Sequence, residues 1–189
     1  MKIESIQSRL DREEIREGLS KVDWNVFLTL LFHRNLPIEE GNKLIHKWDR
    51  LVNQRFYGGR FTLPKNKGKR MVFWGCNGLD SGNHLHTHLL VKVPDRWIKN
   101  GKNGIGFEEV LSECFSRVCE GYRLTRKEKK KFDGKVFFTK DDTGRFDIIN
   151  QDNSVSYPLQ YRHLPFDEYG LDTSTIVESI NSYEVMGMS

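Results

Sequence analysis

Residues 84–93 read HLHTHLLVKV, and this stretch decides the fold that the sequence predicts. Side chains alternate across a β-strand, so the odd-numbered positions, all Leu, Thr or Val, share one face. The opposite face begins with His84, His86 and His88, and Pro94 ends the stretch. An apolar strand face needs a packed layer, whereas a face of imidazoles does not. We therefore expect a strand in a sheet that helices cover on one side only.

The sequence around this strand predicts the rest of the sheet and two long helices. Apolar residues recur with a helical period between Pro37 and Gly58, and again over residues 107–122. Strands rich in β-branched and aromatic residues are expected at 24–32, 70–76, 84–93, 135–140 and 145–150. The order predicts an α+β fold with a central antiparallel sheet of about five strands, ferredoxin-like or RRM-like. Both long helices are expected on one face, and the histidine motif on the other.

The length of 189 residues suits one domain, 1–189, with a single core. We expect an N-terminal helix over 1–22 and an acidic, helical C-terminal tail over 165–189, whose last helix begins near Asp172. No stretch reaches the ~18 apolar residues that a bilayer span needs, so no membrane partner is expected. Three cysteines without a CxxC pair favour a reduced compartment, and we expect the cytoplasm of a bacterial host.

The net charge of +4 conceals an uneven distribution. Residues 50–70 contain seven Lys or Arg and no acid, and residues 122–135 contain seven Lys or Arg against two acids. Residues 163–189 contain five acids and no Lys or Arg. Such runs are often only solvated surface, but the aromatic residues between the first group of cations favour single-stranded nucleic acid, whose bases stack on rings. The expected DNA-binding residues are Arg60, Lys67, Lys69, Arg70, Lys129, Lys130 and Arg162.

Three histidines in alternate register predict a metal site. Same-face neighbours on a strand lie roughly 6.5 to 7 Å apart, so rings tilted toward one point can meet at one ion. The alternative is a polar sheet face whose histidines are only hydrogen-bonded. The expected ligands are His84, His86 and His88, and the expected ion is Mg²⁺ or Mn²⁺, although imidazoles also accept other divalent ions in vitro.

At this strand the sequence resembles the HUH endonuclease superfamily, which includes rolling-circle replication initiators, relaxases and related transposases. Residues 27–30, FLTL, are similar to the family's first motif, and residues 85–94, LHTHLLVKVP, are similar to its metal-binding motif. The family's His pair corresponds either to His84 with His86 or to His86 with His88, and the apolar residues that follow favour the second pair. The family often adds a third polar ligand, for which the local candidates are Cys76, Asn77, Asp80 and His84.

The resemblance also implies a tyrosine nucleophile. Residues 157–161, YPLQY, lie where the family has its nucleophilic tyrosine, with Gln160 in place of the usual lysine. Tyr157 is favoured over Tyr161, and some members of the family use two tyrosines with this separation. The half-buried tyrosines of an ordinary helix would give the same pattern.

Together these features predict a metal-dependent enzyme that nicks and joins single-stranded DNA through a covalent 5′-phosphotyrosine. The resemblance implies that it starts rolling-circle replication of a phage, plasmid or similar element, with single-stranded DNA or an origin hairpin as its substrate. No GxxxxGK[ST] motif is present, so a host helicase and polymerase are expected as partners. The alternatives are a transposase of the same superfamily and a non-catalytic, RRM-like module that binds single-stranded nucleic acid.

Overall fold

A central antiparallel sheet organises the computed structural model, which describes residues 17–32, 36–63, 66, 69–79, 84–122 and 133–140. Three short strands within 166–178 are described by their backbone alone. The elements are β1 (Val26–Phe32), α2 (Ile38–Tyr57), the 3-10 turn η1 (Gly58–Arg60), β2 (Val72–Leu79), β3 (Leu85–Lys92), α3 (Asp95–Asn100), α4 (Phe107–Glu120), β4 (Gly134–Phe138), β5 (Phe166–Asp167), β6 (Gly170–Leu171) and β7 (Ile176–Glu178). The sheet has the order β4-β1-β3-β2, and β7 pairs with the outer edge of β2.

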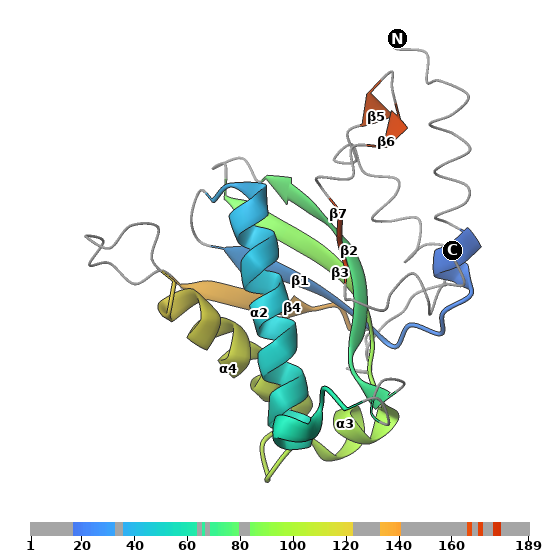
Figure 1. Ribbon diagram of the computed structural model, residues 1–189, viewed down its shortest axis with the longest axis vertical. Helices are drawn as coiled ribbons and strands as arrows, with labels where there is room; N and C mark the ends of the chain where they lie inside the picture. Colours follow the sequence, from blue (N-terminus) through green and yellow to red (C-terminus); the bar gives the residue numbers. More distant parts are fainter. Residues whose placement is uncertain are drawn as a thin grey trace.

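Helices α2 and α4 pack on the same face of the sheet, as the sequence predicted (Figure 1). Both carry one apolar stripe, and both begin with two glutamates in the first turn, where a negative charge favours the helix dipole. Trp48 of α2 donates a hydrogen bond from Nε1 to the carbonyl oxygen of Leu111 in α4, at 3.0 Å. This bond satisfies the indole nitrogen inside the core and fixes the two helices against each other.

The core lies between these helices and the face formed by the even positions of β1 and the odd positions of β3. Leu28, Leu30, Leu89, Val91 and the β2 residue Phe73 are fully buried there. The alternation expected for residues 84–93 is therefore confirmed. The predicted antiparallel hairpin is also confirmed, because β2 pairs with β3 along its whole length.

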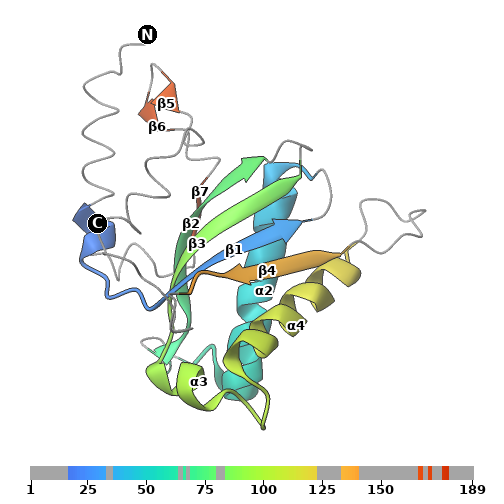
Figure 2. The same ribbon diagram turned by 180° about the vertical axis from the view of Figure 1, so that it is seen from behind.

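The second face of the sheet is partly closed, contrary to the expectation that it would be open. Figure 2 looks onto this face, with the sheet in front of α2 and α4. Trp74 and Leu90 lie on it and are 1% and 0% exposed, and Trp24 and Leu19 are also buried, although none of the four belongs to the helix-side core. Trp24 donates a hydrogen bond from Nε1 to the carbonyl oxygen of Leu19 at 2.8 Å. Apolar side chains at one end of the second face are thus withdrawn from solvent.

The C-terminal tail departs from the prediction. Residues 165–189 were expected to be helical, but Phe166–Asp167, Gly170–Leu171 and Ile176–Glu178 are strands. The β-branched residues at 175–177 suit a strand, and β2 offers an edge with unpaired backbone groups. Of the predicted N-terminal helix over 1–22, residues 17–20 are helical and 1–16 lie outside the described residues. The predicted strand at 145–150 and the predicted helix containing 156–164 also lie outside them.

The junction between α2 and β2 contains a buried polar group that the sequence did not reveal. Asn53, 1% exposed, accepts a hydrogen bond from the Met71 backbone N–H at 2.9 Å and donates one to the Asp49 carboxylate at 2.8 Å. Burial raises the pKa of Asp49 to about 7, against the opposing effects of Arg70 and the Asn53 hydrogen bond.

The raised pKa of Asp49 predicts that the protein loses stability as the pH increases. Protonated Asp49 contributes to the free energy of unfolding. This contribution is fully present below the pKa of about 4 that Asp has in the unfolded chain, and it is lost as the pH rises through about 7, the pKa in the folded state. We expect Asp49→Asn to leave the free energy of unfolding unchanged near pH 4 and to raise it by roughly 2 kcal/mol at pH 8. Urea denaturation across this range measures the effect. Glu39→Gln, which removes an exposed carboxylate that favours the dipole of the same helix, is the contrasting variant and is expected to lower the free energy of unfolding slightly at pH 8. An Asp49→Asn variant that is no more stable than wild type at pH 8 contradicts the expectation.

Candidate metal and nucleic-acid site

Strand β3 places His86 and His88 on the second face of the sheet, away from α2 and α4. In the register of the sheet, His88 lies between Thr29 of β1 and Cys76 of β2, and His86 lies between Leu31 and Gly78. Because β3 has neighbours on both sides, the backbone under both histidines is held by hydrogen-bonded ladders. The two imidazoles thus project from the middle of a rigid sheet.

The rings of His86 and His88 lie next to each other. Their centroids are 5.0 Å apart and their planes meet at 75°. The Nδ1 atom of His88 is 2.8 Å from the hydroxyl oxygen of Thr29, and the Phe27 ring stacks on His88 with a centroid distance of 6.2 Å. A hydrogen bond at one ring nitrogen selects the nitrogen that can bind an ion, so this contact directs His88 to bind through Nε2.

His84 is half-buried and lies just before β3 begins, on the same side of the sheet by alternation. Across the described ranges, no three or more His, Cys, Asp or Glu side chains are arranged to hold a metal ion. The structure therefore brings together the pair His86 and His88, and the ligand set with all three histidines stays a prediction.

The other candidates for a third ligand differ in position and chemistry. Cys76 faces the same side as His88, but burial raises the pKa of its thiol to about 12, so the metal-binding thiolate is scarce at neutral pH. Asn77 lies on the helix side, where it donates to Asn42 at 2.7 Å and accepts a hydrogen bond from Thr87 at 2.6 Å. Asp80 lies outside the described residues. Neither Cys76 nor Asn77 is suited to complete the histidine pair.

The predicted nucleophiles Tyr157 and Tyr161 lie outside the described residues. The same holds for four of the predicted DNA-binding residues, namely Lys67, Lys129, Lys130 and Arg162. Arg60 is exposed at the end of η1. Lys69 and Arg70 line a hollow of about 310 Å³ together with Lys92 and Arg96. Lys92 and Arg96 were not among the predicted DNA-binding residues.

An aromatic side chain that the sequence did not single out completes the face around the histidines. Phe137 of β4 pairs in register with Thr29 and is 52% exposed, more than any other large apolar side chain in the described part of the chain. Thr29 separates it from His88 across the sheet. An exposed ring beside polar groups is a surface on which a base can stack.

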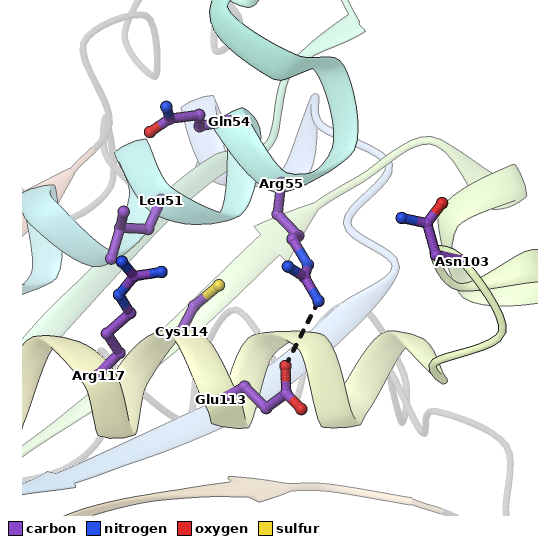
Figure 3. Close-up of a pocket in the computed structure, with 7 residues that line it drawn as sticks. All are labelled: Leu51, Gln54, Arg55, Asn103, Glu113, Cys114 and Arg117. Atoms are coloured by element: carbon purple, nitrogen blue, oxygen red, sulfur yellow. Dashed lines mark ion pairs between the residues drawn. The ribbon is translucent and has the colours of Figure 1, made fainter.

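A second hollow, of about 390 Å³, lies between α2 and α4 (Figure 3). Arg55 of α2 forms an ion pair with Glu113 of α4 at 3.8 Å, and Cys114 contributes to the lining. Burial raises the pKa of the Cys114 thiol, so this cysteine is a poor nucleophile. The hollow belongs to the helical layer and is separated by the sheet from the histidine pair.

Two comparisons with known proteins were informative only in being negative. Neither the models of known protein families nor the curated proteins contain a match to this chain. Within the described residues, no helix is long and apolar enough to cross a membrane.

The contact between Thr29 and His88 predicts how the imidazole behaves when the hydroxyl is removed. We expect Thr29→Val to change the tautomer population of His88 and to lower the free energy of unfolding by about 1 kcal/mol, because a half-buried hydrogen bond is removed. Long-range ¹H–¹⁵N NMR of the imidazole measures the tautomer. Thr29→Ser keeps the hydroxyl and is expected to preserve the wild-type spectrum, whereas identical His88 signals in Thr29→Val rule out the contact.

Proposed function

We propose that this protein is a metal-dependent enzyme that nicks and joins single-stranded DNA through a phosphotyrosine. The observation that carries the proposal is the adjacent pair of imidazoles, His86 and His88, on the face opposite the helices, with His88 oriented by Thr29. Imidazole nitrogens whose tautomer is set by a second hydrogen bond are donors that divalent ions bind. The element order β-α-β-β-α-β, with strands in the order β4-β1-β3-β2, supports a ferredoxin-like sheet.

The described residues supply part of a ligand set for a divalent ion. His86 and His88 would supply two nitrogen ligands, with Mg²⁺ or Mn²⁺ as the proposed ions, and the remaining positions would be filled by His84, a residue outside the described part or water. When bound, the ion would polarise the phosphoryl oxygens of a phosphodiester and stabilise the developing negative charge. Thr29 would hold the His88 ring in place during the reaction.

The proposed chemistry is a transesterification. The hydroxyl oxygen of Tyr157, or of Tyr161, attacks the phosphorus and loses its proton, while the bond from phosphorus to the 3′ oxygen breaks and that oxygen takes up a proton. The products are a 5′-phosphotyrosyl protein and a free 3′ hydroxyl. The reverse attack by a 3′ hydroxyl rejoins the strand without ATP, because the phosphodiester energy is kept in the covalent link. Initiation of rolling-circle replication of a phage, plasmid or similar element, with host helicase and polymerase as partners, is the proposed setting.

The proposal predicts a covalent adduct that depends on the histidine pair. With Mn²⁺ and labelled single-stranded origin DNA, we expect wild type to form a product that survives denaturing electrophoresis. We expect His86→Ala and His88→Ala to reduce its yield at least 100-fold, since each removes a proposed ligand. His46→Ala, on α2, is the matched control and is expected to retain the wild-type yield.

Tyrosine variants identify the nucleophile in the same assay. We expect Tyr157→Phe to abolish the adduct and Tyr161→Phe to reduce it less, because Tyr157 is the favoured nucleophile. If the wild-type protein forms no adduct with any of a set of origin sequences and hairpins, the proposed enzyme is wrong.

A second candidate function is binding of single-stranded nucleic acid without catalysis. The exposed Phe137 ring, close to the histidine face, favours it, because base stacking on such a ring needs no metal. Binding that is unchanged by EDTA, together with absent adduct, identifies this function. A transposase of the same superfamily would form the adduct and is distinguished by joining of the cleaved end to a second DNA.

A further inference from the structure

The basic hollow at the end of the sheet assembles residues that are distant in sequence. It lies where β2 begins, β3 ends and α3 begins, and it measures about 310 Å³. Four of its six lining residues are cationic and none is acidic: Lys69, Arg70, Lys92, Val93, Pro94 and Arg96. We call this hollow the basic pocket. Four cations around one concave site produce a positive potential that favours an anion.

The carboxylates near the basic pocket offset only part of this charge. Lys92 forms an ion pair with the exposed Asp23, at 2.5 Å between Nζ and Oδ2. The positive charge of Arg70 favours the ionised form of Asp49. Burial nevertheless raises the pKa of Asp49 to about 7, so this carboxyl is partly protonated at neutral pH. Exposed ion pairs are weak, so Lys92 can exchange Asp23 for a stronger anion at small cost.

Tyr57 connects two walls of the basic pocket. Its hydroxyl donates a hydrogen bond to the carbonyl oxygen of Lys69 and accepts one from Nη2 of Arg96 at 3.1 Å. The Arg96 guanidinium also lies 5.7 Å from the centre of the Tyr57 ring. Tyr57 therefore ties α3 to the segment before β2 and prearranges two walls of the pocket, which lowers the entropy cost of binding.

Arg70 lines the basic pocket and is only partly exposed. Its Nε atom is buried, and no hydrogen-bond partner for it exists among the residues that the structure describes. A buried N–H without an acceptor costs free energy, but this atom is closed to solvent, so a ligand in the pocket meets other atoms of Arg70. Anionic phosphate oxygens bind arginine N–H groups strongly.

The basic pocket is aligned with the histidine pair along β3. Lys92 is four residues beyond His88, so both side chains lie on the same face, about 13 Å apart along the strand. Leu90 lies between them on this face and is fully buried, so an extended nucleic-acid strand that binds at both places passes around the covered apolar residues to reach Lys92 with a nearby phosphate.

We infer that the basic pocket binds one backbone phosphate of single-stranded DNA, a few nucleotides from the phosphate at the histidine pair. This inference rests on the proposed function for its ligand, and it assigns to Lys92 and Arg96 the binding of the DNA backbone at a fixed distance from the reacting phosphate.

Salt dependence of binding tests the inference. Fluorescence anisotropy with a labelled single-stranded oligonucleotide, without added metal, gives the slope of log K against log salt. Removing one cation that binds a phosphate of a single strand reduces the magnitude of this slope by about 0.7. We expect Arg96→Gln and Lys92→Gln each to reduce it by about that amount and to weaken binding roughly tenfold at low salt. Lys99→Gln removes an exposed cation of α3 outside the pocket and is expected to behave as wild type.

Three outcomes overturn the inference. The first is an unchanged slope in both pocket variants, and the second is an equal reduction in Lys99→Gln, which would indicate general charge attraction. The third is saturable binding of inorganic phosphate, measured by an NMR titration of the Trp97 indole, while the variants bind the oligonucleotide as wild type does. In that case the pocket binds a free anion and not DNA. Thermal unfolding of each variant checks that it is folded.

The adduct assay separates this inference from the proposed enzyme. If wild type forms no adduct but the pocket variants show the reduced slope, the pocket binds DNA and the nicking function is wrong. If wild type forms the adduct and the slopes are unchanged, the enzyme stands and the pocket assignment is wrong.

Discussion

The two-residue alternation of β3 is the constraint on which both the core and the candidate site depend. Leu85, Leu89 and Val91 are completely buried against the helices, and the residues between them include His86 and His88 on the other face. A slip of one residue in the pairing of β3 would turn the histidines into the core and the leucines out of it. The hydrophobic free energy that holds the helices on the sheet therefore also fixes where the imidazoles point.

The same pairing positions the groups that act on the imidazoles. Thr29 reaches His88 because β1 lies beside β3 in a register that places these two residues opposite each other, although they are 59 positions apart in sequence. Gly75, diagonally opposite on β2, has no room for a side chain, because a Cβ atom there would clash with the His88 carbonyl oxygen and the Leu89 side chain. Close strand packing on both sides thus keeps the His88 backbone in one position. A site built on such a backbone needs little reorganisation when a ligand binds.

The sequence allowed the local elements to be predicted but not their long-range contacts. The stripes of α2 and α4, and the alternation in β1 and β3, are periodic patterns with direct structural meaning. The strand Ile176–Glu178 was predicted as helix because a good N-cap sequence precedes it, while the β2 edge that pairs with it is invisible in the local sequence. The six-residue helix α3 is too short to give a periodic signal. The burial of Trp74 and Leu90 was missed because an apolar residue on a strand does not reveal what covers it.

Charge gives the clearest example of what only the fold can reveal. Counting along the chain identified Lys69 and Arg70 within a basic run, but Lys92 and Arg96 lie outside both basic runs. The antiparallel pairing of β2 with β3 sets Val72 opposite Lys92, so the start of one strand meets the end of the other and the four cations converge. Because Lys92 also shares a face with His86 and His88, the pairing that forms the core places one cation of an anion-attracting pocket on the same side of the sheet as a pair of potential metal ligands. A phosphate chain is a ligand whose repeating charges can occupy both places at once.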